Sequence, residues 1–402
     1  GGACKNNKPQ PNLYICRILL NGGGSRAIIL PHLQRPPVIV KQQRAVTTAV
    51  ELRPQRSHHL HDWYCGNGYC GNGSHGQGKE EEKRVVVIMG ATGTGKSKLS
   101  VDLSVMFSGE VVNSDKIQVY RGLDITTNKI PVVERRGVPH HLLGELDPAA
   151  GELPPVGFRA LAERSIGDIS ARRRVPVLAG GSNSFIHALL SDRYDPRRDP
   201  FGPAGARWRR VTEVEGLRYR CCLLWVHVEA AVLAEHLDRR VDEMVGEGMV
   251  EELERYFAAE GKAERHPGLG KAIGVPEFRG YFTGRGGRTA AAYEAAVAAI
   301  KSNTRRLAEE QVRKIERLAA LGWPLRLVNA TNTVAARLAG EGPVAATTAP
   351  WRRDVAGPSA AAVERFLEND DWDHRRSRSR SRSRHRLTRT RTRAVLPPIK
   401  VC

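Results

Sequence analysis

The sequence has no apolar run that approaches the roughly 20 residues of a membrane-spanning helix. Its apolar runs are short, such as RVVVIMG and CCLLWVHV, and runs of this length are typical of buried strands. A hydrophobic content of 41% over 402 residues is normal for a globular protein with a sizeable core. We therefore expect no integral membrane segment and no membrane partner.

Acidic residues are missing from two stretches of the chain. The first 50 residues contain seven Lys or Arg and no acid, and His374–Arg393 contains ten Arg and no acid. These stretches account for most of the net charge of +20, so the rest of the chain is close to neutral. Because a near-neutral core lacks an evident track for a phosphate backbone, we expect no nucleic-acid partner for it.

Cysteine usage and the N-terminal composition bear on the cellular compartment. The seven cysteines form no regular framework, and Cys221 and Cys222 lie within an apolar, strand-like run, so a reducing compartment fits best. The first 83 residues lack sustained periodicity and contain no acid before Glu51. This composition resembles a transit peptide and favours the plastid, with the cytoplasm and the mitochondrion as alternatives.

Composition divides the chain into four parts. These are a disordered leader (1–83), a core (84–330) with a helical subdomain at about 230–290, a linker with a short helix at 359–368 (331–373), and a disordered Arg/Ser-rich tail (374–402). The tail is predicted to be disordered because like charges at every second position cannot bury surface. We expect the protein to be a monomer.

Short apolar strands alternate with helical periods throughout the core, which predicts an α/β fold with an open, mostly parallel sheet flanked by helices. The expected strands are 85–89, 110–114, 175–179, 221–228 and 324–328. Apolar residues at i, i+3 and i+4 predict an amphipathic helix over 156–173. Longer helical stretches are expected at 230–259 and 289–320.

The strongest motif is a glycine-rich loop that follows the first strand and opens a helix. It satisfies the pattern G-x-x-x-x-G-K-[ST] and consists of Gly90, Ala91, Thr92, Gly93, Thr94, Gly95, Lys96 and Ser97. Its backbone amides and the helix N-terminus favour phosphate oxygens, Lys96 neutralises their charge, and the Ser97 hydroxyl is placed to bind Mg²⁺. The core is therefore predicted to have a P-loop NTPase-like fold and to work on a diphosphate or polyphosphate.

A second feature lies 19 residues beyond Lys96, where the predicted strand EVVNS delivers Asp115 at its carboxyl end. Ligands of open parallel sheets bind at that edge. From the residues alone, this carboxylate can bind Mg²⁺, accept a proton from a nucleophile, or cap the next turn. These three roles remain open at this point.

Several longer motifs together resemble the plant adenylate isopentenyltransferases, the cytokinin synthases. They are GATGTGKS, NSDKIQVYRGLDITTNK (Asn113–Lys129), GVPHHLLG (Gly137–Gly144), GGSNSFIHALL (Gly180–Leu190), KAIGVPE (Lys271–Glu277), IKSNT (Ile300–Thr304) and WRRDVAGPSAAAVERFL near the end. The resemblance runs in order from about residue 84 to 368. It is far more specific than the glycine loop alone.

The resemblance implies an enzyme that transfers a dimethylallyl group from dimethylallyl diphosphate to N6 of AMP, ADP or ATP, the first step of cytokinin biosynthesis, with Mg²⁺ as cofactor. In this family the glycine loop binds the diphosphate of the donor, and Asp115 orients and deprotonates the amine. By the same match, Ser182 and Lys271 face the diphosphate, while Ser114, Asp115 and Arg305 face the adenine nucleotide. A helix N-cap for Ser182 and surface positions for Lys271 and Arg305 are the structural alternatives.

One departure from the family pattern bears on the site. Glu309 and Glu310 occupy a turn of the last long helix where relatives usually carry small or basic residues. Acidic side chains there would weaken a nearby phosphate contact. The Arg/Ser-rich tail is also foreign to the family.

Three other functions compete with this interpretation. A tRNA dimethylallyltransferase is disfavoured by the NSDKIQVY form of the motif, by the short 191–220 segment and by the lack of a Cys/His module after the core. A small-molecule kinase or NTPase is disfavoured because no convincing Walker B strand appears after the first 120 residues. An RNA-binding role rests on the Arg/Ser run alone, without an aromatic stacking motif.

Overall fold

The computed structural model describes residues 83–202, 216–259, 266–284, 287–340 and 345–368. The predicted Arg/Ser-rich tail and, apart from Lys83, the predicted leader lie outside these residues. All of the described residues belong to one compact unit of the chain.

The described core is built on a six-stranded sheet in the order β3-β2-β4-β1-β5-β6, in which every neighbouring pair is parallel. The strands are β1 (Arg84–Gly90), β2 (Gly109–Asn113), β3 (His140–His141), β4 (Val175–Gly180), β5 (Arg220–His227) and β6 (Arg326–Asn329). The predicted α/β class and open parallel sheet are confirmed. Sequence analysis did not predict β3, because its two residues form no apolar run.

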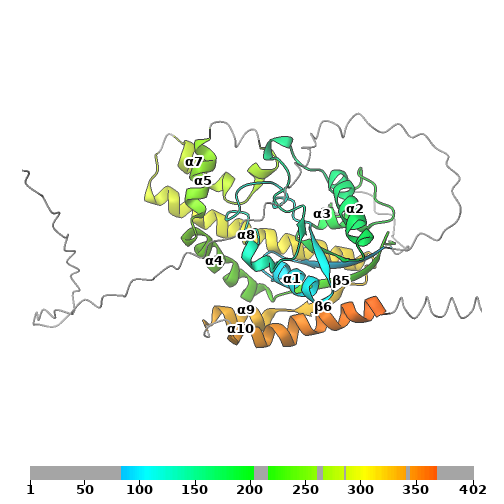
Figure 1. Cartoon of the computed structure of the whole chain (residues 1–402). Helices are drawn as coiled ribbons and strands as arrows, with labels where there is room; N and C mark the ends of the chain where they lie inside the picture. Colours follow the sequence, from blue (N-terminus) through cyan, green and yellow to red (C-terminus); the bar gives the residue numbers. More distant parts are fainter. Residues whose placement is uncertain (1–82, 203–215, 260–265, 285–286, 341–344, 369–402) are drawn as a thin grey trace, which may run out of the picture. The chain divides into compact units, whose positions relative to one another are not determined.

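Helices connect the strands and cover both faces of the sheet (Figure 1). They are α1 (Lys96–Met106), α2 (Pro155–Ala171), α3 (Asn183–Leu190), α4 (Ala230–Gly246), α5 (Met249–Ala258), α7 (Val275–Thr283), α8 (Ala290–Ala320), α9 (Thr331–Leu338) and α10 (Ala345–Pro350). Among the described residues, none of the helices combines the length and the apolar character needed to cross a membrane.

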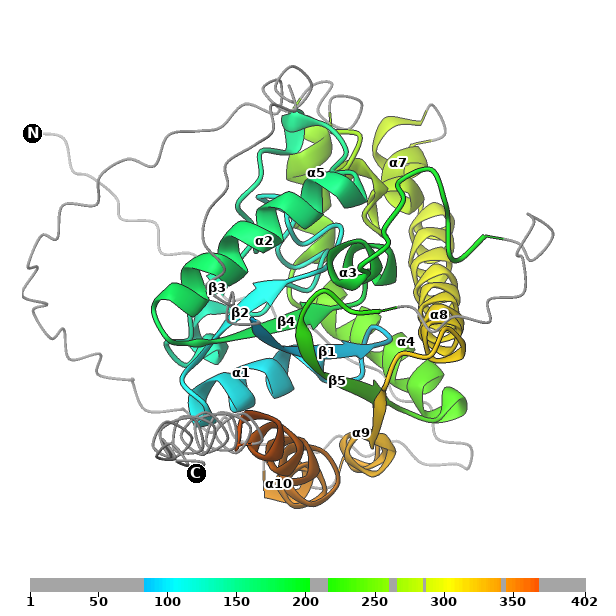
Figure 2. The ribbon, with the colours of Figure 1, turned by 90° about the vertical axis from the view of Figure 1, so that its right-hand side faces the viewer.

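Alternation along the strands sends side chains into two separate cores. On β1, Val85, Val87 and Met89 join the core shared with α2, α3 and most of α8. Val86 and Ile88 point the other way, into the core shared with α1, the first half of α4 and α9. Figure 2 shows the sheet between these two layers, with α2 and α3 on one side and α1 and α10 on the other.

The stretch predicted as one helical region over 230–259 is two helices. Gly248 adopts a left-handed backbone with φ of 99° and separates α4 from α5. Glycine adopts this conformation without steric cost, which explains the break. Helices α5, α7 and the start of α8 then pack through aromatic side chains such as Phe257, Phe278 and Tyr293, and form the helical subdomain.

From residue 331 the chain was predicted to be a linker with a short helix at 359–368. That helix is present, but the described residues before it are also helical and pack against the core. After α9, α10 continues through a π-helical turn (Trp351–Ala356) into a helix over 357–368. We call residues 345–368 the C-terminal helix. Trp351, Val355 and Val363 are buried in the same core as α1. Alanine-rich composition was taken for a linker, although alanine is the strongest helix former.

A buried carboxylate connects several elements at the end of the sheet that lies opposite the glycine loop. Glu110, at the start of β2, is 3% exposed and accepts hydrogen bonds from Arg172 at 2.7 Å and from His141 at 2.7 Å. Burial opposes ionisation of Glu110, but these hydrogen bonds outweigh it and lower its pKa below the ordinary 4.5. The network ties β2, β3 and the end of α2 together.

Replacing Glu110 by Gln should lower the free energy of unfolding at pH 7 by about 1–3 kcal/mol, the usual worth of hydrogen bonds to a charged group. Because the folded-state pKa is lowered, the carboxylate stabilises the fold above its unfolded-state pKa, and this contribution disappears as the pH falls through the folded-state pKa. Urea unfolding should therefore show a constant gap between the two proteins down to about pH 4.5 and a shrinking gap at lower pH. A gap that stays constant as the pH falls below 4.5 would contradict the assignment.

Candidate active site

The glycine loop, residues 90–97, has the geometry expected of a phosphate-binding loop. It follows β1 and ends at Gly95, which caps the N-terminus of α1 with φ of 91°. Gly93 has φ of 84°, and a Cβ there would lie 2.7 Å from the side chain of Leu237 on α4. A larger residue would be strained at either position. The predicted strand, loop and helix are thus present in the predicted order.

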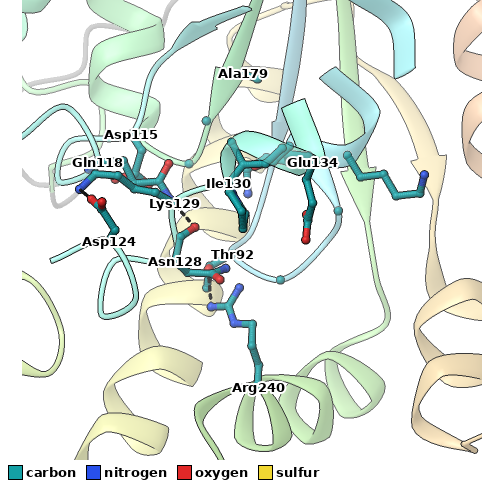
Figure 3. A pocket seen from close by; sticks show the side chains of 18 of the residues that line it. Thr92, Asp115, Gln118, Asp124, Asn128, Lys129, Ile130, Glu134, Ala179 and Arg240 are labelled. Carbon is teal, nitrogen blue, oxygen red and sulfur yellow. Dashed lines mark hydrogen bonds and ion pairs between the residues drawn. The ribbon is translucent and has the colours of Figure 1, made fainter. Parts of the chain in front are cut away.

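A cavity of about 540 Å³ opens in front of this loop (Figure 3). It lies at the carboxyl ends of β1, β2 and β4, where open parallel sheets bind ligands. The loop residues that line it are Thr92, Gly93, Gly95, Lys96 and Ser97. Asp115 and Gln118 line it after β2, Gly180 and Gly181 after β4, and Arg240 from α4.

Lys96 lines the cavity and is hydrogen-bonded to the backbone of the loop. Its Nζ donates to the carbonyl oxygen of Ala91 at 2.7 Å. Burial lowers its pKa from 10.5 to about 8, Asp115 opposes this shift, and the positive charge of Arg240 adds to it. A phosphate in the cavity would relieve both unfavourable effects, because it supplies the missing negative charge.

Arg240 is a second cation at the loop, and sequence analysis did not find it. Its Nη2 donates to Thr92 Oγ1 at 2.8 Å, while its buried Nε has no hydrogen-bond partner among the described residues. Burial and, to a smaller extent, nearby Arg337 lower the pKa of Arg240 to about 10, and Glu243 opposes this shift. A signal for it existed, because Arg240 interrupts an apolar stripe of α4 that includes Leu237 and Met244.

Gln311 on α8 fastens the loop to the neighbouring strand end, and it was also missed. Its Oε1 accepts from the Thr92 amide at 2.8 Å, and its Nε2 donates to the Gly181 carbonyl at 3.1 Å. The side chain is 7% exposed and follows Ile300, Thr304 and Ala308 along the buried stripe of α8. An amide in a buried stripe is the sequence signal that could have found it.

Asp115 lies at the carboxyl end of β2, as predicted, and lines the cavity. Its Oδ1 accepts from the amides of Ile117 at 2.9 Å and Gln118 at 3.2 Å, so it caps the following turn. Among the described residues, Oδ2 has no hydrogen-bond partner. The cap fixes the carboxylate in place and leaves its second oxygen available to a ligand.

The segment after Asp115 forms one wall of the cavity. Gln118 Nε2 donates to the carbonyls of Thr127 at 2.9 Å and Asn128 at 3.0 Å, which closes the loop on itself (Figure 3). Glu252 on α5 accepts from the amides of Ile125 and Thr126. The long motif NSDKIQVYRGLDITTNK therefore forms a wall of the cavity that is held in place by hydrogen bonds from its own side chains and from the helical subdomain.

Other predicted residues do not line the cavity. Gly90, Ala91 and Thr94 serve the loop itself, as Thr94 Oγ1 donates to the Ala91 carbonyl at 2.9 Å. Ser114 is fully buried, and Ser182 Oγ accepts from the amide of Lys116 at 2.8 Å without capping α3.

The two predicted cations outside the loop are engaged elsewhere. Lys271 pairs with Glu152, and Arg305 pairs with Asp238 on α4. Neither lines the cavity, and neither do Glu309 and Glu310, so the acidic departure from the family pattern lies away from the phosphate loop. The cations beside the glycine loop that line the cavity include Lys96 and Arg240 instead.

No group of three or more His, Cys, Asp or Glu side chains in the described part of the chain could bind a metal ion on its own. Ser97 is exposed and lines the cavity, and Asp115 lines the same cavity. Magnesium commonly takes only one or two protein ligands and completes its shell with phosphate oxygens and water. The residues present therefore fit a magnesium ion that arrives with a phosphate ligand.

Comparison with known proteins identifies the family. The model of the IPP transferase family matches residues 118–214 and 201–317. The adenylate isopentenyltransferase of Humulus lupulus is 48% identical over 298 residues, which are 70% of this chain and 89% of that protein. The chain belongs to the IPP transferase family.

Two further comparisons place this IPP transferase among its relatives. Adenylate isopentenyltransferase 1, chloroplastic, of Arabidopsis thaliana is 46% identical over 72% of this chain and 82% of its own length. The solved structure of the tRNA isopentenylpyrophosphate transferase of Bacillus halodurans is 26% identical, with a TM-score of 0.53, and the match covers 72% of this chain and all of that one. The chain thus shares its fold with this solved structure.

Diphosphate affinity of this IPP transferase should depend on pH through Lys96. Since the pKa of Lys96 is about 8 without ligand and an anion raises it, binding is strongest below pH 8 and weakens as the pH rises through that value. Calorimetric titration with inorganic diphosphate should give wild type a ~10–100-fold advantage over Lys96→Gln at pH 7, the size of a charge-assisted contact.

Diphosphate itself changes its protonation over this pH range, and this affects its binding to wild type and to Lys96→Gln alike. The ratio of the two Kd values therefore reports the titration of Lys96. The advantage of wild type should shrink by up to about tenfold per pH unit above pH 8. An advantage that stays the same from pH 7 to pH 9.5 would contradict the lowered pKa of Lys96, and no advantage at pH 7 would show that Lys96 does not contact the anion.

Proposed function

We propose that this protein transfers a dimethylallyl group from dimethylallyl diphosphate to the N6 amine of an adenine nucleotide, the first step of cytokinin biosynthesis. The observation that carries the proposal is one cavity lined by the glycine loop, by the cations Lys96 and Arg240, whose pKa values are lowered by burial, and by the fixed carboxylate of Asp115. The relatives named adenylate isopentenyltransferase support the same activity.

The phosphate loop would bind the diphosphate of the donor. Breaking the allylic carbon–oxygen bond leaves both bonding electrons on the diphosphate oxygen, and negative charge grows there. Lys96, Arg240 and the loop amides stabilise that charge in a partly water-excluded site, where such interactions are strongest. The nucleophile nitrogen forms the new bond to the allylic carbon, and inorganic diphosphate leaves.

Asp115 would orient the adenine amine and take its proton. An adenine N6 amine is a weak nucleophile, so holding it in line with the donor carbon contributes as much as proton removal. Because Oδ1 is held by two backbone amides, Oδ2 is the oxygen that would accept the proton. The carboxylate then needs no rearrangement between binding and chemistry.

Magnesium is the proposed cofactor, held by the Ser97 hydroxyl together with oxygens of the donor diphosphate. When bound, it would neutralise part of the charge that develops on the leaving group. The plastid is the proposed location, supported by the acid-free first 50 residues and by the relative named chloroplastic.

A product assay tests the proposed reaction against its nearest alternative. Purified protein is incubated with dimethylallyl diphosphate and Mg²⁺, and either an adenine nucleotide or unmodified tRNA is added. Mass spectrometry should show the N6-prenylated nucleotide and no prenylated tRNA. Prenylated tRNA without prenylated nucleotide would overturn the choice of acceptor, and phosphate release from ATP without donor would favour a kinase or NTPase.

Replacing Asp115 by Asn should reduce turnover about 10²–10⁴-fold, the usual contribution of a general base. The amide oxygen can still accept from Ile117 and Gln118, so the turn and the affinity for donor should be nearly unchanged. Asp242→Asn is the matched control, because Asp242 pairs with Lys301 on the surface. Steady-state kinetics gives the turnover rate of both variants. A turnover rate of Asp115→Asn close to that of wild type would show that Asp115 is not the base.

A further inference from the structure

The C-terminal helix touches the phosphate loop through one side chain, Trp351. A Cβ built on Gly95 would lie 3.0 Å and 3.1 Å from two carbon atoms of the Trp351 ring, so the ring packs directly on the glycine. Trp351 is 5% exposed. Gly95 caps α1 and precedes Lys96, so this contact lies at the residue that sets the start of the helix and the direction of the lysine.

The same side chain is oriented by a buried hydrogen bond to α1. The indole Nε1 donates to Asp102 Oδ2 at 2.8 Å, and Asp102 also accepts from Arg136 at 2.8 Å and from Lys98 at 3.2 Å. The ring therefore spans the first two turns of α1, from Gly95 to Asp102. A hydrogen bond of this kind fixes the orientation of the ring, which apolar packing alone would not do.

Lys98 connects this arrangement to the cavity. Its ammonium lies 5.0 Å from the centre of the Trp351 ring, within the range of a cation–π contact, and Lys98 lines the cavity. One indole thus contacts two residues of the cavity wall, Gly95 and Lys98. Both lie on the side where the donor diphosphate would bind.

Trp351 also begins the π-helical turn of the C-terminal helix, directly after Pro350. π-helical turns are rare and occur frequently at functional sites. Val355, which is fully buried, anchors the other side of the turn in the core. The match to the family model ends at residue 317, so this contact is made by a part of the chain outside the matched residues.

We propose that Trp351 is a positioning residue, through which the C-terminal helix holds the phosphate loop in its diphosphate-binding conformation. A glycine can adopt several backbone conformations, and the left-handed conformation of Gly95 is only one of them. The Trp351 ring, packed against Gly95, would disfavour the other conformations by steric contact. Preorganised amides bind an anion more tightly than amides that must first be ordered. Trp351 therefore acts on the affinity for the diphosphate group and not on the transfer step.

The test compares Trp351→Phe with Val363→Ala. Phenylalanine keeps an aromatic side chain but loses the indole N–H and part of the contact with Gly95. Val363 is fully buried in the C-terminal helix, in the same core, so its truncation controls for general destabilisation. Calorimetry with inorganic diphosphate gives Kd, kinetics give KM and kcat for each substrate, and thermal unfolding gives Tm.

Trp351→Phe should raise the Kd for diphosphate about tenfold, equivalent to about 1.4 kcal/mol, and should raise the donor KM in parallel. The acceptor KM and kcat should stay within about twofold of wild type. Val363→Ala should lower Tm at least as much without changing Kd. A Kd for Trp351→Phe equal to wild type, or an equal rise in Val363→Ala, would overturn the proposal.

Asp102→Leu provides a second test if Trp351→Phe folds poorly. It removes the acceptor of the indole N–H while leaving the ring intact, but it also releases Lys98 from its ion pair, so it is made in a Lys98→Gln background. Relative to Lys98→Gln alone, it should raise the Kd for diphosphate. An unchanged Kd in the folded double variant would contradict the proposal. Only the identification of the ligand as the prenyl donor rests on the proposed function. The measurements with inorganic diphosphate do not depend on it. If the wild-type protein bound diphosphate but formed no prenylated product, the proposed function would be refuted and the role of Trp351 would not.

Discussion

Two partly buried cations beside one glycine loop, Lys96 and Arg240, are the constraint on which the site depends. Burial lowers the pKa of Lys96 to about 8 and that of Arg240 to about 10, so keeping these side chains charged costs free energy. A diphosphate would relieve that cost, and relief is greatest when its negative charge is greatest. The same arrangement that binds a diphosphate therefore favours its departure from an allylic carbon.

The fold supplies this arrangement by bringing three strand ends together. The phosphate loop follows β1, Asp115 follows β2 and the Gly180–Gly181 pair follows β4, and these three strands are neighbours in the sheet. Gln311 ties the first of these ends to the third, and Arg240 approaches from α4. Long helices from the far part of the chain therefore complete a site whose centre is set by the first 35 residues of the core.

Sequence analysis found the parts of the site that are local in the chain. The loop, Ser97 and Asp115 were predicted because strand, glycine spacing and helix start follow one another directly. Arg240, Gln311 and Trp351 were missed because their roles arise only when α4, α8 and the C-terminal helix pack against the loop. For Arg240 and Gln311, a polar residue within an apolar stripe was the available signal.

The prediction of the fold shows the same difference: features set by neighbouring residues were predicted, and features set by packing between distant elements were not. The five strands that appear as apolar runs were located within two residues. In contrast, the segments 331–338 and 345–358 were taken for a linker although they are helical, and only the helix over 359–368 was predicted. Their burial involves Val334 on α9 and, in the C-terminal helix, Trp351, Val355 and Val363 at multiples of four residues, a helical spacing that sequence analysis recognised only over 359–368.

A crystal structure of the protein with Mg²⁺, an adenine nucleotide and a non-reactive thiolo analogue of dimethylallyl diphosphate tests the central claim most directly. The account predicts that the diphosphate of the analogue lies against residues 90–97, in contact with Lys96 and Arg240, with the adenine amine beside Asp115. Phosphates of the adenine nucleotide bound in that loop, with the prenyl diphosphate elsewhere, would contradict it.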